Sequence, residues 1–215
     1  MAASNDSSEH AAGAPATEPI RLRMPISAQT AESLRLGDTV VLDGEIVVSA
    51  GLPTYQRIKD FIDAGTPLPL DLADGALFHI GSFNRELPDG SFEILYLNPT
   101  TSTRFNALMP ALIEGLNLHA VGGKGGLDAR CAEAMARAGC VYLSFPGGGC
   151  ASYLEALRGV REVAWPDLIS HYRLVRLRVE GLGPATVAID AQGRSLYDEI
   201  VRHAHETRRL HRATL

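Results

Sequence analysis

The amino-acid sequence predicts a mixed α/β domain in which some of the strands pair in parallel. Short apolar runs such as "LHAVGG" (118–123) and "CVYLSF" (140–145) alternate with helical patterns of about a dozen residues, such as "LDARCAEAMARAG" (127–139). The chain has 215 residues, of which 46% are hydrophobic, so it can bury a core as one large domain or two small ones.

The N-terminal stretch "MAASNDSSEHAAGAPATEP" is rich in Ala, Ser, Pro and acidic residues. This composition predicts a disordered tail over residues 1–20, ahead of a folded domain over residues 21–215. The stretch lacks the positive and apolar regions of a secretory signal, and no apolar run approaches the roughly 18 residues that cross a bilayer. A net charge of -5 is also unlike that of a dedicated nucleic-acid binder. We therefore expect a cytoplasmic protein that binds neither membranes nor nucleic acids.

The first half of the domain is expected to hold a hairpin, a helix and two strands. In "LRLGDTVVLDGEIVVSAG" (34–51), a turn at Gly37-Asp38 precedes β-branched runs on either side of Asp43-Gly44, which predicts a hairpin with a two-residue turn. "PTYQRIKDFIDAG" (53–65) predicts a helix that ends at a Gly65 cap. "GALFHIGS" (75–82) and "FEILYLNP" (92–99) predict two buried strands that flank the polar turn "NRELPDG" (84–90).

The second half continues the alternation. After the strand, helix and strand already described, "GCASYLEALRG" (149–159) predicts a short helix. Three further strands are expected at "VREVAW" (160–165), "RLVRLRVEG" (173–181) and "PATVAID" (184–190). The final "SLYDEIVRHAHETRRLHR" (195–212) predicts an amphipathic helix, packed on one face and solvated on the other, with basic residues near its C-terminus.

The chain has three cysteines, Cys131, Cys140 and Cys150, at spacings of nine and ten residues. These spacings match no zinc pattern, which favours close pairs. Distant cysteines can still build a three-cysteine iron–sulfur site, so spacing alone leaves that alternative open. We interpret the three as small buried side chains and assign none of them to a metal.

The stretch "NPTTSTRFNALMP" (98–110) is the first candidate site. A helix is expected to begin here, with Thr100 or Thr101 as its N-cap and apolar positions at Phe105 and beyond. Thr100 and Arg104 would then share a face, and Arg104 could hold a carboxylate bidentately beside a threonine hydroxyl. A helix N-terminus also favours anions. Ordinary capping with a solvated arginine remains the alternative.

Two glycine-rich loops are the next candidates. "VGGKGG" (121–126) places Lys124 between Gly123 and Gly125, and "FPGGGCAS" (145–152) again lies between a strand and a helix. The first is not a phosphate-binding P-loop, since Lys124 is followed by glycine, and a flexible turn with an exposed lysine is the alternative. If the loops meet at one sheet edge, they form a pocket in which Arg104 and Lys124 would suit a dicarboxylate.

Seven segments together resemble the C-terminal domain, or separate β subunit, of class I iron–sulfur fumarases and L-tartrate dehydratases. They lie in the matching order across residues 34–196 and read "LRLGDTVVLDGEI", "GTPLPLDLADGALFHIG", "PTTSTRF", "VGGKGG", "VYLSFPGGGCA", "VAW" and "GPATVAIDAQGRSLY". The resemblance implies a swivelling β/β/α fold, with a mixed sheet and flanking helices. It also implies reversible addition or removal of water at a carbon–carbon double bond beside a carboxylate.

The resemblance also assigns residues. Thr100 corresponds to a threonine proposed for proton transfer, Lys124 to the lysine of a Gly-Lys-Gly loop, and Arg104 to an arginine that binds a substrate carboxylate. Thr101, Gly123 and Gly125 would line the substrate site with them.

The resemblance implies a partner as well. The family's [4Fe-4S] cluster is held by an α-type domain or subunit, and the three cysteines here do not occupy its ligand positions. The chain would therefore need an α-type iron–sulfur subunit, in an assembly built on a homodimer or an α2β2 arrangement, and would be inactive alone.

One segment departs from the family pattern. Where members read T-x-R-D-x-x-H-x-R, this chain has "VVSAGLPTYQRI" (47–58), and Arg57 resembles only the trailing arginine. Counted forward, the arginine, aspartate and histidine positions fall at Ala50, Gly51 and Thr54; counted back, they fall at Gly51, Leu52 and Tyr55.

Two functions follow: a hydro-lyase for a hydroxy di- or tricarboxylic acid with altered specificity, or a non-catalytic paralogue that binds a carboxylate or a partner protein.

Overall fold

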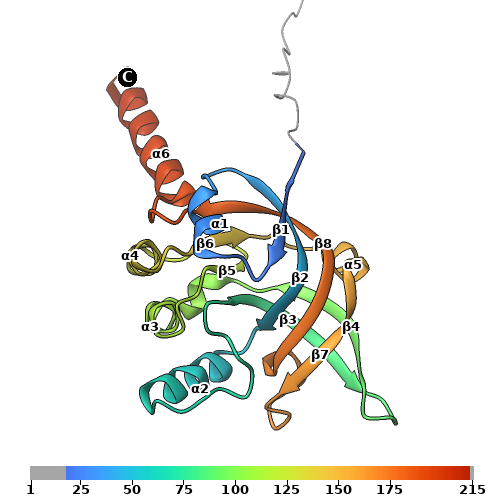
Figure 1. The fold of residues 1–215 in the computed structure, drawn as a ribbon. Coiled ribbons are helices and arrows are strands. Elements are labelled where there is room, and N and C mark those ends of the chain that lie inside the picture. Colours follow the sequence, from blue (N-terminus) through green and yellow to red (C-terminus); the bar gives the residue numbers. More distant parts are fainter. Residues whose placement is uncertain (1–17, 214–215) are drawn as a thin grey trace, which may run out of the picture.

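The computed structural model describes residues 18–213, which form a curved mixed sheet with helices around it (Figure 1). The strands are β1 (Ile20–Met24), β2 (Thr39–Ser49), β3 (Ala76–Glu86), β4 (Phe92–Pro99), β5 (Ala120–Gly123), β6 (Val141–Ser144), β7 (Leu157–Ala164) and β8 (Leu174–Ile189). The helices are α1 (Ala28–Ser33), α2 (Leu52–Asp63), α3 (Met109–Gly115), α4 (Ala129–Ala138), α5 (Cys150–Glu155) and α6 (Leu196–Ala213), with 3-10 turns η1 (Ser102–Phe105) and η2 (Ser170–Tyr172).

The strand order is β1-β2-β3-β5-β6-β8-β7, with β4 paired to β3. Strands β1, β2, β3, β5 and β6 pair in parallel, whereas β4, β7 and β8 pair antiparallel to their neighbours. Because β8 also pairs with β2, the pairings β2–β3–β5–β6–β8–β2 close into a ring. The expected mixed α/β class with partly parallel pairing is confirmed.

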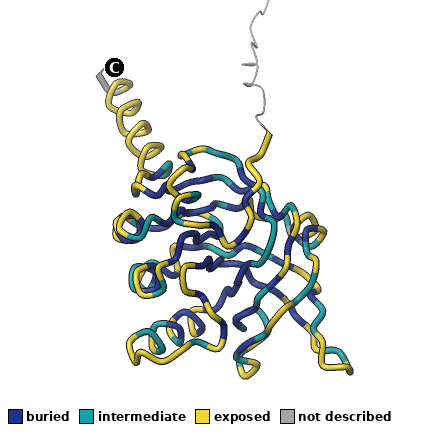
Figure 2. Tube along the Cα trace, in the orientation of Figure 1, coloured by how far each residue is buried: buried dark blue, intermediate teal, exposed yellow. Residues whose placement is uncertain are grey.

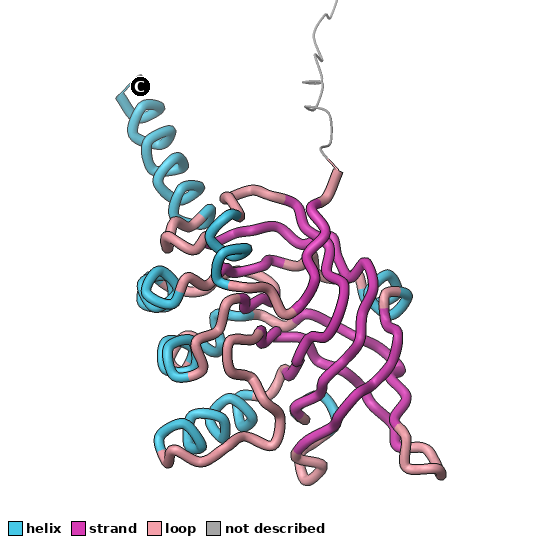
Figure 3. The backbone as a smooth tube through the Cα atoms, in the orientation of Figure 1, coloured by secondary structure: helices cyan, strands magenta, loops and turns pink. Residues whose placement is uncertain are grey.

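Alternate residues of the strands enter two different cores, as the two-residue period of a strand requires. Val48, Phe78 and Leu143 point into the interior of the ring. Their neighbours Val47 and Leu77 join a second core under α2, α3 and α4. These helices lie along one side of the sheet (Figure 3), and the buried strand segments lie between the two cores (Figure 2).

Capping residues in the sequence correctly predicted the ends of two helices, α2 and α4. Asp128 caps α4 by accepting a hydrogen bond from the Cys131 N–H at 3.1 Å, and Gly139 ends that helix at φ +65°. Gly65 follows α2 at φ +61°, as expected for a C-terminal glycine. No helix within residues 18–213 is long and apolar enough to cross a membrane.

The predicted hairpin at Asp43-Gly44 is wrong, because β2 runs straight through these residues. Gly44 has φ +106°, and a Cβ there would lie 2.5 Å from the Met24 carbonyl oxygen, so the glycine allows β1 to approach β2. The register with β8 shifts on both sides of Leu42. The Asp-Gly pair therefore marks an irregular point within a paired strand, and not a turn. Strand β1, which covers this point, was not predicted.

Other boundaries also differ from expectation. The strands predicted at 173–181 and 184–190 form the single strand β8, since the chain bends at Gly181 and Gly183 without leaving the sheet. Strand β3 continues to Glu86, and β4 is only partly buried, because one of its faces is open to solvent.

The C-terminal helix α6 is packed only at its start. It projects away from the sheet (Figure 1), and Ile200, Val201 and Leu210 are 65%, 54% and 66% exposed. The expectation of a helix packed along one face is therefore wrong for its later turns. Of the predicted tail, residues 1–17 lie outside the described chain, and Ile20 already belongs to β1.

Candidate functional site

The Thr100–Arg104 segment does not begin a long helix. It forms the short turn η1, and α3 begins later, with a proline at its first or second position. The Thr101 side chain makes no capping hydrogen bond within the described residues. A 3-10 turn does begin here with Thr101 at its N-cap position, as predicted, but the predicted side-chain cap and the continuous helix beyond Phe105 are wrong. The backbone of the segment instead forms hydrogen bonds with the sheet.

Backbone hydrogen bonds join this segment to two central strands. The Thr100 N–H donates to the His79 carbonyl oxygen at 2.8 Å. The Lys124 N–H donates to the Thr100 carbonyl oxygen at 3.0 Å, and the Ser102 N–H donates to the Lys124 carbonyl oxygen at 3.0 Å. Thr101 and Lys124 thus face each other as a parallel bridge. The structure brings the first two candidate loops together, as predicted from their positions at strand ends.

Three buried side chains fix η1 from below. The Ser102 Oγ lies 2.7 Å from the His79 Nδ1 and 2.7 Å from the Tyr142 hydroxyl. Burial lowers the pKa of His79 to about 3, so its imidazole is neutral at pH 7. Burial also raises the pKa of Tyr142. The network that supports the loop is therefore uncharged.

The two predicted glycines have different environments. Gly123 is buried, and a Cβ there would overlap the Ser102 Oγ and lie 2.8 Å from the His79 Cβ. Only glycine fits at this contact. Gly125 is exposed, with φ +74°.

Thr100 and Arg104 line a cavity of about 170 Å³ at this edge of the sheet. The Arg104 Nη1 donates a hydrogen bond to the Thr100 Oγ1 at 3.2 Å, so the predicted pair does share one face. The full lining consists of Ala50, Gly81, Tyr96, Asn98, Thr100, Arg104, His171 and Tyr172. No Asp or Glu among the described residues lines it, so its charge is positive or neutral.

Lys124 is not among the described residues that line this cavity. Its side chain extends toward the loop after β6, where a Cβ on Gly147 would lie 3.6 Å from the Lys124 Cδ and 4.0 Å from its Nζ. In the described chain this cavity does not include Lys124, and a pocket shared by Arg104 and Lys124 stays a prediction. The backbones meet, but the two cationic side chains leave the bridge in different directions.

The segment that departs from the family pattern forms another side of the cavity. Ala50 lines it, and a Cβ on Gly51 would lie 2.5 Å from the Tyr172 Cβ. Thr54 is buried and donates a hydrogen bond to the Tyr172 carbonyl oxygen. Of the positions counted for the absent arginine, aspartate and histidine, Ala50, Gly51, Thr54 and Tyr55 hold small or buried side chains, whereas Leu52 is 45% exposed.

Arg57, the one basic residue retained there, is engaged elsewhere. Its guanidinium donates to both carboxylate oxygens of Asp167, at 3.1 and 2.9 Å, and lies 5.2 Å from the centre of the Trp165 ring. The pairing lowers the pKa of Asp167 through the hydrogen bond from Arg57.

Sequence reasoning missed His171 and Tyr96 as lining residues. His171 lies in "ISHY" (169–172), an irregular connection between two strands, and nothing in its period or spacing marks it. Its place in the cavity depends on tertiary contacts of η2. Tyr96 lies on the solvent side of β4. It was missed because this strand was predicted to be fully buried.

Two of the three cysteines are buried, as expected. Burial raises the pKa of Cys131 to about 12 and also raises the pKa of Cys140, so both are neutral thiols. Within residues 18–213, no group of three or more His, Cys, Asp or Glu side chains is arranged to hold a metal ion. These two cysteines lie in the second core and do not fit an iron–sulfur cluster. The Cys150 side chain is outside the described part of the structure.

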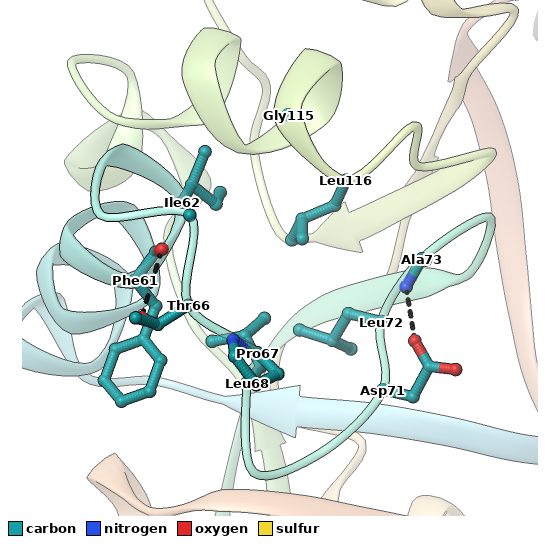
Figure 4. Close-up of a pocket in the computed structure, with 11 residues that line it drawn as sticks. Phe61, Ile62, Thr66, Pro67, Leu68, Asp71, Leu72, Ala73, Gly115 and Leu116 are labelled. Carbon is teal, nitrogen blue, oxygen red and sulfur yellow. Dashed lines mark hydrogen bonds between the residues drawn. The ribbon is translucent and has the colours of Figure 1, made fainter.

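A larger cavity of about 380 Å³ lies between the end of α2, the following loop and the end of α3 (Figure 4). It is lined mainly by apolar groups such as Phe61, Ile62 and Leu116. Its acidic residue, Asp71, accepts a hydrogen bond from the Ala73 N–H at 3.0 Å. This cavity lacks the cation and free hydroxyl that chemistry on a small acid would use, so the Thr100–Arg104 cavity is the better candidate.

Several known proteins resemble this chain over most of its length. The family described as fumarase C-terminus matches residues 2–200. L(+)-tartrate dehydratase subunit beta of Escherichia coli (strain K12) is 30% identical over 178 residues, which cover 83% of this chain and 86% of that protein. A Methanocaldococcus jannaschii protein with the provisional name L(+)-tartrate dehydratase subunit beta is 29% identical over 182 residues, or 84% of this chain and 92% of that protein. A longer Geobacillus stearothermophilus protein, provisionally named fumarate hydratase class I, is 29% identical over 192 residues, which cover 87% of this chain and 35% of that protein. This chain belongs to the fumarase C-terminus family.

Proposed function

We propose that this chain is the β subunit of a hydro-lyase that reversibly adds water to, or removes it from, a hydroxy di- or tricarboxylic acid. The observation that carries the proposal is the Arg104–Thr100 contact at 3.2 Å inside a cavity without acidic side chains. The names of the relatives, tartrate dehydratase subunit beta and fumarate hydratase, support the same reaction class. We also assign the closed sheet to the swivelling β/β/α type.

In this proposal Arg104 binds one substrate carboxylate. Its guanidinium is exposed, and its one hydrogen bond to a described residue is the bond to Thr100, so it can rotate to present two N–H groups. Neutralising that carboxylate makes the adjacent carbon–hydrogen bond more acidic. Substrate binding and proton removal then take place beside the same arginine.

Thr100 would accept or return the proton at that carbon. A threonine hydroxyl is a weak base, so its deprotonated form needs stabilisation by a nearby positive charge. We assign that role to Arg104, whose Nη1 already donates to the Thr100 Oγ1. Lys124 is joined to this loop by its backbone, and we propose that its ammonium acts from the neighbouring loop once the partner subunit covers the site. Thr101 pairs with Lys124, and Gly123 leaves room for Ser102, so these two residues keep the loops in contact. Gly125 is exposed, and we propose that all three residues line the substrate site.

The [4Fe-4S] cluster of the proposed enzyme would be carried by an α-type partner subunit. The buried, protonated Cys131 and Cys140 do not suit it, so the residues described here bind the acid and move its proton. The designation subunit beta in the E. coli relative supports a partner of this kind. We propose an assembly built on a homodimer or an α2β2 arrangement.

A non-catalytic paralogue that binds a carboxylate is the second candidate. The observation in its favour is Ala50, which lines the cavity at one of the positions counted for an absent arginine. A binding protein would keep Arg104 for recognition but would not need Thr100.

The test is anaerobic co-production with a cluster-bearing subunit, followed by an absorbance assay for hydration of unsaturated di- and tricarboxylic acids. We expect turnover of at least one acid and a loss of about 100-fold or more in kcat/KM for Arg104→Ala. Arg137→Ala is the control, since Arg137 is an exposed arginine paired with Glu114 on the helical side. Absence of turnover by a complex with an intact cluster would favour the binding protein, and full activity of Arg104→Ala would refute the role of Arg104.

A further inference from the structure

We propose that His171 is a second carboxylate-binding group of the cavity, beside Arg104. This inference rests on the proposed function and adds a residue to it. His171 lies in η2, about 70 positions along the chain from Arg104, and both side chains line the same cavity of about 170 Å³.

The imidazole is available for a ligand. Within residues 18–213, no hydrogen bond or ion pair to it is formed, and its ring packs edge-on against Tyr172 with centroids 4.7 Å apart. No carboxylate among the described residues lines the cavity, so no acidic side chain there competes with a ligand for His171 or Arg104. A cavity with an imidazole and a guanidinium, and no acid, is complementary to a dianion.

Small residues make room for His171. A Cβ on Gly81 would lie 3.4 Å from the His171 Cβ and 3.2 Å from the Ala50 Cβ. A larger residue at either position would compete with the imidazole for this space. The absence of a long side chain at Ala50 thus coincides with a basic side chain reaching the same cavity from η2.

The backbone of His171 is firmly held. Its carbonyl oxygen accepts a hydrogen bond from the Ala50 N–H at 3.0 Å. The neighbouring Ser170 Oγ accepts from the Asn84 N–H at 2.6 Å and donates to the Asn84 carbonyl oxygen at 2.9 Å, while the Asn84 Nδ2 donates to the Ser170 carbonyl oxygen at 3.1 Å. Arg173 in turn donates to the Asn84 Oδ1 at 2.8 Å. A group fixed this way loses little further entropy when it binds a ligand.

The test uses the assembled complex with fumarate as the diacid and crotonate as the matched monoacid. His171→Ala should raise KM for fumarate about 10- to 100-fold, the loss expected for one hydrogen bond to a charged group, with a much smaller change in kcat. His171→Arg should restore most of the affinity. His203→Ala is the control, because His203 is an exposed histidine on α6. An unchanged KM for fumarate in His171→Ala would overturn the proposal.

If the complex shows no turnover at all, calorimetric titration of the full-length chain separates the two questions. Fumarate that binds more tightly than crotonate, with the difference lost in His171→Ala, would support the role of His171 although the hydro-lyase proposal fails. Equal affinities for fumarate and crotonate, or no binding of fumarate by the unaltered chain, would overturn the role of His171 itself.

Discussion

The two walls of the cavity are attached to the protein in different ways. The wall that carries Thr100 and Arg104 is hydrogen-bonded through its backbone to His79 and Lys124, in the middle of the sheet, and rests on the buried Ser102. The wall that carries His171 is an irregular turn outside the strands, held by the bond from the Ala50 N–H to the His171 carbonyl oxygen and by the bonds between Ser170 and Asn84. Movement of the first wall would break pairing in the middle of the sheet, whereas a substitution of the His171 side chain leaves these backbone bonds in place. We propose that the first wall carries out proton transfer and the second determines the choice of acid.

The largest expected effect is on the first wall. Thr100→Val keeps the shape of the side chain but removes the hydroxyl, so the proposed proton transfer has no acceptor. We expect kcat of the assembled enzyme to fall about 10²- to 10⁴-fold, with Thr100→Ser retaining much of the activity. Steady-state kinetics of both variants measure the change. Activity of Thr100→Val equal to that of the unaltered enzyme would remove Thr100 from the mechanism.

The buried, neutral His79 under the first wall predicts that the free energy of unfolding depends on pH. The pKa of His79 is about 3 in the folded protein and close to 6.5 when the chain is unfolded, so between these values the unfolded state binds more protons. The contribution is therefore complete above about pH 6.5 and is lost as the pH falls toward 3, by up to about 1.4 kcal/mol per unit. Urea unfolding between pH 4 and 7 measures it. His79→Gln should reduce this slope, and an identical slope in both proteins would contradict the assignment to His79.

Removal of the hydroxyl that links His79 to Tyr142 should weaken the same support. Ser102→Ala leaves two buried polar groups short of a partner, and we expect a loss of about 1–3 kcal/mol in the free energy of unfolding. Thr103→Ala is the matched control, because Thr103 is an exposed hydroxyl residue in the same turn, and its change should stay within about 0.5 kcal/mol. Equal losses in the two variants would show that the buried network does not hold the wall.

The smallest effect is expected for the second wall. Ser170→Ala removes the Oγ that bonds to the Asn84 backbone, and η2 should become less well positioned. We expect a several-fold rise in KM for the diacid, corresponding to about 1 kcal/mol, with kcat nearly constant. A fall in kcat with an unchanged KM would show that this wall takes part in the chemical step. It would contradict the proposal that the two walls have different roles.

Local signals explain which parts of the fold could be predicted from the sequence. Helix α4 was placed within two residues at either end, because the Asp128 cap and the left-handed Gly139 act within their own turn. The Asp43-Gly44 pair has the same local signature as a hairpin turn, but contact with Met24, nearly 20 residues earlier, determines its conformation. Helix α6 has an amphipathic sequence, yet no described surface covers its apolar side beyond the first turns.

Some features of the candidate site could likewise be predicted from the sequence, and others could not. The proximity of Thr100 and Lys124 follows from strand ends that meet at one edge of a sheet, and it could be expected before the structure. The directions of the Arg104 and Lys124 side chains could not, because no local pattern fixes them: Arg104 bonds to Thr100, and Lys124 extends toward Gly147. His171 reaches the cavity only through an irregular turn held by Asn84, and neither residue belongs to a motif.

The most direct test is a crystal structure of the assembled complex with a four-carbon diacid bound, because it locates both carboxylates at once. We predict one carboxylate within hydrogen-bonding distance of the Arg104 guanidinium, with the Thr100 Oγ1 near the adjacent carbon, and the other carboxylate at the His171 imidazole. A diacid bound instead between Lys124 and the Gly147 loop, with Arg104 and His171 facing solvent, would contradict both the proposed chemistry and the proposed choice of acid.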